Sequence, residues 1–173
     1  MLPVLREYGI PAVAYVSPGL IECEQPTVDL PEDYMTWDQI RTLTDHHVAI
    51  GSHGWSHRSL GQMSLDEAQQ EALRSRQTLE ERLGRPVNSL AYPYGTRADY
   101  SEATARMLGE CDYTTAFTSQ HGAVLRGLDA LNLPRVKVEG GESLAMFQLI
   151  CRGALDAWRL VDQALWQLQQ AGK

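Results

Sequence analysis

Short apolar runs alternate with helix-like segments along most of the chain, and this alternation restricts the fold more than any other feature. The predicted strands cover residues 12–16, 48–50, 87–91, 112–118 and 133–138. Segments with the periodicity of amphipathic helices lie between several of them. Because two parallel strands need a long crossover connection, usually a helix, the sequence predicts an α/β fold with a largely parallel sheet or barrel.

Capping residues mark the expected helix ends. Thr36, Ser64 and Ser101 are typical N-cap residues, and each stands directly before a segment with helical periodicity. Gly9 and Gly84 follow such segments, where a glycine often ends a helix in the left-handed conformation. These positions predict helices that alternate with the strands.

Length and composition fit a single domain. With 173 residues and 43% hydrophobic content, residues 1–173 are expected to form one domain with its own core. The formal net charge of −7 disfavours nucleic acid as a partner, because a phosphate backbone requires a basic face. No run of eighteen apolar residues occurs and the first residues lack a signal-peptide pattern. The chain as written is therefore expected neither to span a membrane nor to carry an export signal, and its localisation stays open.

The C-terminal segment has a helical pattern of its own. Apolar residues recur at intervals of three and four over residues 143–170, which predicts one long terminal helix. The pattern comprises Leu144, Phe147, Cys151, Ala154, Trp158, Val161, Leu165 and Leu168. Two interpretations stay open: the helix packs on the sheet, or it forms the seam of a homodimer.

Two of the five histidines, His53 and His57, follow the predicted strand at 48–50. Their spacing of four residues would place both imidazoles on one side of a helical turn, where they could bind one metal ion. Functional sites in parallel α/β sheets gather beyond the carboxyl ends of the strands, which favours this interpretation. The alternative is a surface turn with two solvated histidines.

Ile50–His57 contains a His-x3-His motif, Tyr92-Pro93-Tyr94-Gly95 is an aromatic turn directly after a predicted strand, and Leu2–Val16 has the pattern of a helix followed by a strand. Together these segments resemble the polysaccharide deacetylase family, the NodB-homology carbohydrate esterases. Ile50–His57 is similar to the family's metal-binding motif, and Tyr92–Gly95 is similar to the aromatic turn that lines its substrate groove. Leu2–Val16 resembles the helix and strand that follow its first motif. The resemblance implies a distorted, incomplete (β/α) barrel of the NodB-homology type, and a metal-dependent hydrolase that removes N-acetyl groups from an N-acetylated polysaccharide.

The resemblance also implies roles for single residues. His53 and His57 would bind a divalent metal, with Zn²⁺ the expected ion. The backbone N–H of Tyr94 would stabilise the oxyanion that forms during acyl transfer. Tyr92, Pro93 and Tyr94 would present an apolar face to the sugar, and the alternative for them is a turn without a binding role.

Arg135 is similar to the arginine of a Leu-Pro-Arg segment in one branch of the family, which resembles the deacetylases of biofilm poly-N-acetylglucosamine. In that role Arg135 would help to orient carboxylates of the site. A strand arginine paired with a surface acid is the alternative. Ala91 stands where many other relatives have an arginine, a departure that is also similar to this branch.

The family's first motif, Thr-Phe-Asp-Asp-Gly, is expected just upstream of Leu2 and does not occur in this sequence. In the family one of its aspartates is the general base and the other is a third metal ligand. The resemblance therefore implies an N-terminally incomplete deacetylase domain, with the general-acid histidine of this branch also upstream. The alternative is a degenerate, non-catalytic module of the same fold that binds glycan or forms dimers.

Overall fold

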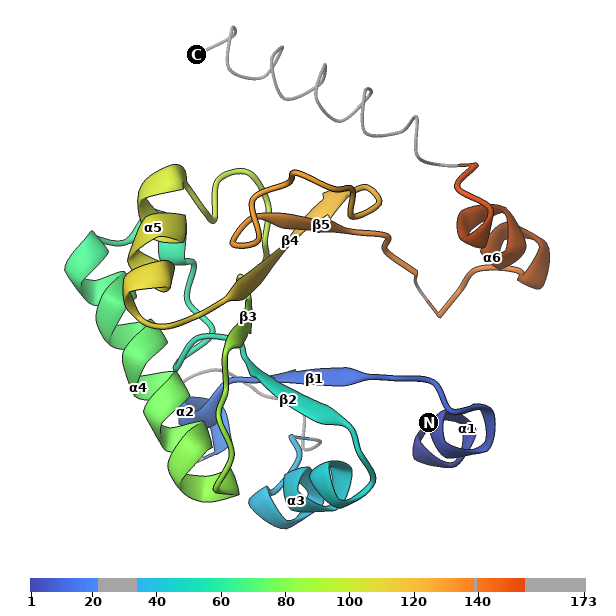
Figure 1. Cartoon of the computed structure of the whole chain (residues 1–173), viewed down its shortest axis with the longest axis horizontal. Coiled ribbons are helices and arrows are strands. Elements are labelled where there is room, and N and C mark those ends of the chain that lie inside the picture. The colour runs from blue at the N-terminus through green and yellow to red at the C-terminus, as the bar shows by residue number, and fades with distance from the viewer. Residues whose placement is uncertain (22–33, 139, 155–173) are drawn as a thin grey trace, which may run out of the picture.

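Five short strands form one parallel sheet whose spatial order follows the chain. The computed structural model describes residues 1–21, 34–138 and 140–154. The sheet consists of β1 (Val13–Val16), β2 (Ala49–Ser52), β3 (Ser89–Ala91), β4 (Thr115–His121) and β5 (Leu133–Arg135) (Figure 1). This order is that of consecutive β/α-barrel units, whereas a doubly wound sheet reverses its order at a switch point. The predicted α/β fold with a parallel sheet is confirmed.

Helices connect most of the strands, and one helix precedes the first strand and another follows the last. They are α1 (Leu2–Tyr8), α2 (Pro18–Ile21), α3 (Trp37–Asp45), the 3₁₀ helix η1 (Leu60–Gln62), α4 (Leu65–Leu83), α5 (Glu102–Glu110) and α6 (Leu144–Cys151). The hydroxyl oxygens of Thr36, Ser64 and Ser101 each accept a hydrogen bond from the backbone N–H three residues later. Gly9 and Gly84 end α1 and α4 in the left-handed conformation. The predicted caps are therefore confirmed.

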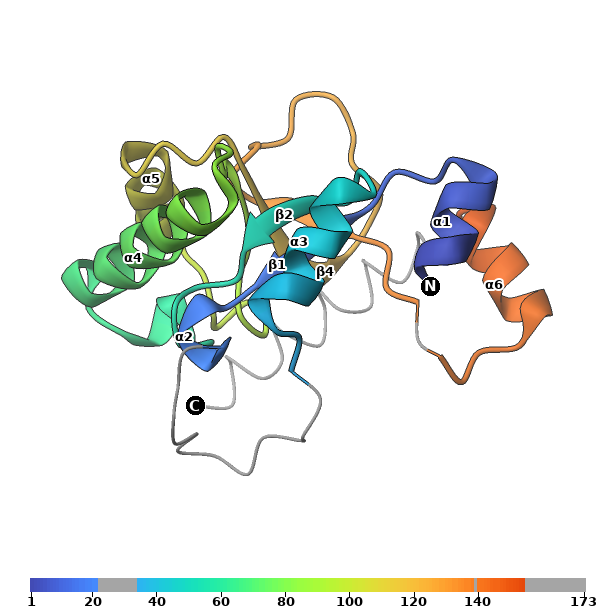
Figure 2. The ribbon, with the colours of Figure 1, turned by 90° about the horizontal axis from the view of Figure 1, so that it is seen from below.

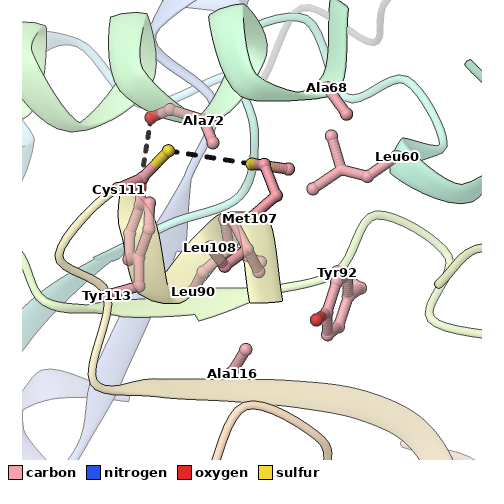
Figure 3. Close-up of a cluster of buried hydrophobic side chains, with 10 residues drawn as sticks. All are labelled: Leu60, Ala68, Ala72, Leu90, Tyr92, Met107, Leu108, Cys111, Tyr113 and Ala116. Atoms are coloured by element: carbon pink, nitrogen blue, oxygen red, sulfur yellow. Dashed lines mark hydrogen bonds between the residues drawn. The ribbon is translucent and has the colours of Figure 1, made fainter. Parts of the chain in front are cut away.

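α4 and α5 pack on the sheet and bury the larger of two apolar clusters (Figure 3). This cluster consists of Leu60, Ala68, Ala72, Leu90, Tyr92, Met107, Leu108, Cys111, Tyr113 and Ala116. The small side chains of Ala68 and Ala72 let the backbone of α4 lie close to its neighbours. The hydroxyl of Tyr113 donates a 2.9 Å hydrogen bond to the Ala72 carbonyl, and burial raises the pKa of this phenol. A second cluster, made of Val16, Ile40, Leu79 and Val87, joins α3 to α4 and the sheet.

The strand expected at 112–118 begins three residues later than predicted. Cys111 is the C-cap of α5 and Asp112 has a φ of 59°, so these two residues complete the helix end and do not belong to a strand. β5 is also shorter than the expected 133–138, because it ends at Arg135. The other strand boundaries agree to within two residues.

The long helix predicted for residues 143–170 does not form as one continuous element. α6 ends at Cys151, and Gly153 then adopts a φ of 74°, a conformation that ends an α-helix. The remainder of the predicted helix lies outside the described residues. Leu144 and Phe147 are 72% and 43% exposed, so the described part does not bury its apolar pattern in the core. The homodimer interpretation stays a prediction.

α1 and α6 lie at the end of the molecule opposite α4 and α5 (Figures 1 and 2). α1 buries none of its residues: Val4 and Tyr8 within the helix, and Ile10 just after it, are at least half exposed.

No helix in the described ranges is long and apolar enough to cross a membrane.

Leu108→Ala is expected to lower the free energy of unfolding by about 2–5 kcal/mol, because Leu108 is fully buried between α5 and the sheet. The matched control is Leu125→Ala, which truncates a leucine that is 59% exposed and should change stability by less than about 0.5 kcal/mol. Urea denaturation monitored by circular dichroism measures both. Equal effects of the two substitutions would contradict the described core.

Candidate metal-binding site

His53 and His57 meet beyond the carboxyl end of β2. Their ring centroids are 4.7 Å apart and the rings are nearly perpendicular, at 77°. The loop that joins them contains no helix, and Gly54 and His57 have positive φ values of 73° and 58°. The expectation of a helical turn is therefore wrong. Two left-handed residues, one of them a glycine, fold the chain back and bring the imidazoles together.

The ring of His53 is oriented by the end of the neighbouring strand. Its Nδ1 lies 2.6 Å from the carbonyl oxygen of Ala91, the last residue of β3. A carbonyl oxygen can only accept, so Nδ1 carries the hydrogen and Nε2 keeps a free lone pair. A bond of this kind is the usual outer-shell support of a metal-binding histidine.

Burial lowers the pKa of His53. The hydrogen bond to Ala91 opposes this effect, whereas electrostatic interactions with His57 and Arg135 lower the pKa further. Because neutral imidazole is the form that binds metal, the environment keeps His53 ready to act as a ligand near neutral pH.

β1 holds the other side of the same loop. The backbone N–H of His53 donates to the Val16 carbonyl at 2.8 Å, and the hydroxyl of Ser17 donates to the His53 carbonyl at 2.8 Å. Both backbone groups of His53 are thus satisfied by residues at the end of β1. The orientation of this side chain therefore depends on three neighbouring strands, β1, β2 and β3.

The aromatic turn lies beside the histidines, but its three residues differ in exposure. Tyr92 is fully buried in the core, and its hydroxyl donates to the Leu131 carbonyl at 2.9 Å. Pro93 is also fully buried. Because both side chains are buried, the expectation that Tyr92 and Pro93 present an apolar face to a sugar is wrong. Both residues instead anchor the turn in the core.

Tyr94 is the exposed residue of this turn. Its side chain is 61% exposed, and its ring centroid lies 4.9 Å from that of His57. Tyr94 adopts a φ of 60°, and among the described residues its backbone N–H has no hydrogen-bond acceptor. This donor is thus available to a ligand next to the histidine pair. Its assignment as an oxyanion donor stays a prediction.

Gly95 fixes the turn against β4. The N–H of Ser119 donates to the Gly95 carbonyl at 2.8 Å. A Cβ added to Gly95 would lie 2.6 Å from the Ser119 nitrogen, and the φ of Gly95 is 66°. Both the close backbone approach and the left-handed conformation require glycine here.

Arg135 lies within electrostatic range of the histidines. Its Nε donates to the Thr118 carbonyl at 2.7 Å. Its charge adds to the lowering of the His53 pKa that burial causes, and it opposes the rise in the Tyr15 pKa that burial causes. The alternative of an ion pair with a surface acid is not seen among the described residues. Arg135 is therefore fixed at the edge of the site, and its role toward carboxylates stays a prediction.

A cavity of about 240 Å³ opens beside the two histidines. Apolar side chains make up most of its wall: Val16, Leu20, Ile21, Met35 and Ile40, with Tyr15, Ser17 and Tyr34. Sequence reasoning assigned no role to Ser17 or to the apolar wall, because these residues come from separate elements.

Whether the two imidazoles fit a metal ion depends on the chemistry of their donor atoms. Two imidazoles, one of them with its Nδ1 bonded to a carbonyl, fit a divalent metal that prefers nitrogen ligands. Within the described ranges no third His, Cys, Asp or Glu joins them. A catalytic zinc site usually has three protein ligands, of which these two imidazoles would supply two.

The parallel sheet of consecutive β/α units matches the fold of NodB-type deacetylase structures. Residues 1–116 match the family model described as polysaccharide deacetylase, which is more than half of the chain. The chain belongs to the polysaccharide deacetylase family, and the family assignment from the sequence is confirmed.

Individual relatives are distant and longer. YxkH of Bacillus subtilis (strain 168), named for this family, is 25% identical over 145 residues, which are 84% of this chain and 48% of YxkH. The structure of the Streptococcus pyogenes deacetylase PplD in complex with acetate is similar, with a TM-score of 0.74 and 23% identity over 86% of this chain and 62% of PplD. A de-N-acetylase from Aggregatibacter actinomycetemcomitans gives a TM-score of 0.68 and 18% identity, covering 86% of this chain and 68% of that protein. At these identities the structural likeness establishes the fold alone.

His53→Ala and His57→Ala each remove an expected metal ligand. Loss of an outer-shell partner alone weakens metal binding ~10–100-fold, so each variant is expected to bind Zn²⁺ at least that much more weakly. His46→Ala is the matched control, since His46 lies at the end of α3 away from the pair. Competition with a chromophoric chelator measures the affinity. Unchanged binding in both site variants would contradict the proposed ligands.

Gly95→Ala is expected to lower the free energy of unfolding by about 1–3 kcal/mol more than Gly127→Ala, because only Gly95 packs against backbone atoms. Gly127 is the matched control: its φ is 87°, and a Cβ there would meet nothing within 4 Å. Both variants share the strain of a left-handed alanine, so the difference between them isolates the steric contact with Ser119. Denaturant titrations of equal midpoint would contradict the tight approach.

Proposed function

We propose that this chain carries the histidine ligands and the aromatic turn of a metal-dependent hydrolase that removes N-acetyl groups from an N-acetylated polysaccharide. The observation that carries the proposal is the convergence of His53, His57 and Tyr94, with ring centroids 4.7 and 4.9 Å apart, beyond adjacent strands of a polysaccharide deacetylase domain. The similarity to a de-N-acetylase supports the choice of an amide substrate.

Amide hydrolysis sets the chemical requirements. The carbonyl carbon of an acetamide is a weak electrophile, so the reaction needs a nucleophile active near neutral pH and stabilisation of the negative charge that develops on the oxygen. His53 and His57 would hold the metal, and zinc is the expected ion because imidazole ligands suit it. When bound, such an ion supplies an acidified water and polarises the carbonyl.

The backbone N–H of Tyr94, which has no acceptor among the described residues, would donate to the developing oxyanion. Its position next to His57 and its lack of a described acceptor support this role, because a preorganised donor needs no rearrangement during the reaction. The exposed ring of Tyr94 would contact the sugar, while Tyr92 and Pro93 keep the turn in place from the core.

Arg135 would bind negative charge at the edge of the site. Its Nε is tied to the Thr118 carbonyl, which leaves the terminal nitrogens of the guanidinium for a carboxylate, either of the enzyme or of the substrate. The resemblance of its Leu-Pro-Arg segment to the poly-N-acetylglucosamine branch supports a β-linked N-acetylglucosamine polymer as the substrate class.

The general base is the element that the described residues do not provide. No acidic side chain joins the two imidazoles within the described ranges. By the family resemblance this base is an aspartate of the motif expected before Leu2. Loss of a general base costs ~10²–10⁴-fold in rate, so the chain on its own is expected to hydrolyse acetamides slowly.

A second candidate function follows from the same observation. Two imidazoles that no third His, Cys, Asp or Glu joins within the described ranges also suit a non-catalytic module that binds glycan through Tyr94 and its surroundings. This candidate predicts binding of N-acetylglucosamine oligomers with no release of acetate at any metal concentration.

Acetate release from N-acetylglucosamine oligomers separates the two. The hydrolase proposal predicts release above the metal-free control when Zn²⁺ is added, and loss of that release in His53→Ala, because the substitution removes a metal ligand. An enzyme-coupled acetate assay over long incubations measures the slow rate. Glycan binding without acetate release, unchanged by chelator, would instead support the non-catalytic module.

A further inference from the structure

A carboxylate on α4 satisfies three donors of the loop between the two histidines. Oε2 of Glu71 accepts from the backbone N–H of Trp55 at 3.0 Å and from that of Ser56 at 2.9 Å. Oε1 of Glu71 accepts from the Ser56 hydroxyl at 2.8 Å. All three donors therefore lie in the segment that separates His53 from His57.

These bonds stabilise a backbone shape that is otherwise costly. The loop has left-handed residues at Gly54 and His57, and the second is not a glycine. Between them the consecutive N–H groups of Trp55 and Ser56 converge on one oxygen atom, an arrangement suited to an anion. Without an acceptor these amides would have to find water, and the loop would lose the contact that selects this conformation.

Other contacts hold Trp55 but do not reach Ser56. The Trp55 carbonyl accepts from the N–H of Gly19 at 2.9 Å, and the guanidinium carbon of Arg74 lies 3.7 Å from the centroid of the Trp55 ring. A Cβ at Gly19 would lie 2.6 Å from the indole nitrogen, so α2 and Trp55 are in close contact. Among the described residues, Glu71 is the partner of both the N–H and the hydroxyl of Ser56.

We infer that Glu71 is a positioning residue: it fixes the turn that sets the separation of the His53 and His57 imidazoles, and thereby the affinity of the site for its metal. This inference rests on the proposed function. Glu71 acts on the two histidines through its bonds to the backbone N–H groups of Trp55 and Ser56 and to the Ser56 hydroxyl. The length of its side chain and its acceptor atoms make these bonds possible.

Two conservative substitutions distinguish the effect of the side-chain length of Glu71 from the effect of its charge. Glu71→Gln removes the charge but keeps the length, so its amide oxygen can accept from both backbone N–H groups while its NH₂ donates to the Ser56 hydroxyl. Glu71→Asp keeps the charge but is one methylene shorter, so it cannot span the same distances. Positioning by hydrogen bonds predicts that Gln rescues metal affinity and that Asp does not.

The experiment measures Zn²⁺ affinity by chelator competition for the full chain and four variants: Glu71→Ala, Glu71→Asp, Glu71→Gln and the matched control Glu81→Gln. Glu81 is an exposed glutamate near the end of the same helix. Glu71→Ala and Glu71→Asp are expected to bind ~10–100-fold more weakly, which is the usual cost of losing an outer-shell partner. Glu71→Gln is expected to stay close to the unchanged chain, as is Glu81→Gln.

Thermal unfolding without metal accompanies each measurement, because a purely structural residue would lower the melting temperature without changing the affinity of the folded protein. If Glu71→Ala does not fold, the Gln and Asp variants carry the comparison. If Glu71→Asp bound Zn²⁺ as tightly as the unchanged chain, or if Glu71→Gln bound it weakly, the inference that Glu71 positions the loop by its hydrogen bonds would be overturned. Failure of the unchanged chain to bind Zn²⁺ would overturn the metal site itself, and the inference with it.

Discussion

A hydrogen bond of 2.6 Å between Nδ1 of His53 and the carbonyl oxygen of Ala91 joins the ends of two neighbouring strands, and the candidate site is arranged around it. β2 leads into His53, and β3 ends at Ala91, directly before the aromatic turn. Because parallel strands end at the same edge of the sheet, one bond between them both fixes the imidazole tautomer and brings the turn next to the histidines. His57 then contacts both parts, His53 on one side and Tyr94 on the other.

α4 connects the stability of the domain with the geometry of the site. Its alanines at 68 and 72 are fully buried against the sheet, and Glu71 between them holds the histidine loop. One turn later the hydroxyl of Ser75 lies 2.8 Å from that of Ser52, the last residue of β2. The left-handed backbone at His57 and Tyr94 has a cost, and such strain persists only where packed surroundings fix it. The helix, the sheet edge and the two strained residues therefore form one unit.

Much of the fold follows from local patterns in the sequence. The N-caps at Thr36, Ser64 and Ser101 depend on the side chain and its next three residues, so they could be recognised without tertiary information. The strands could be located because short apolar runs separate the helices. The end of α6 was missed although Gly153 marks it, because the apolar spacing continues past that glycine.

The sequence predicted which segments form the candidate site but not their detailed geometry, and each difference has a physical reason. A spacing of four residues suits both a helical turn and a folded loop, and only the backbone dihedrals at Gly54 and His57 distinguish them. The sequence of the aromatic turn does not reveal which rings face the core, so the burial of Tyr92 could not be seen. Glu71 lies 15 residues from Ser56, so no local pattern could predict their contact. The sequence offers one hint of a role for Glu71: it is a charged residue beside the buried face of α4.

Histidine side-chain ¹H–¹⁵N correlation spectra recorded during a Zn²⁺ titration test the central claim most directly. The account predicts that the resonances of His53 and His57 change together at equal metal occupancy, that His53 coordinates through Nε2, and that its Nδ1 stays protonated and bonded to Ala91. The other histidines should not respond. Coordination of His53 through Nδ1, or a response confined to histidines outside this loop, would contradict it.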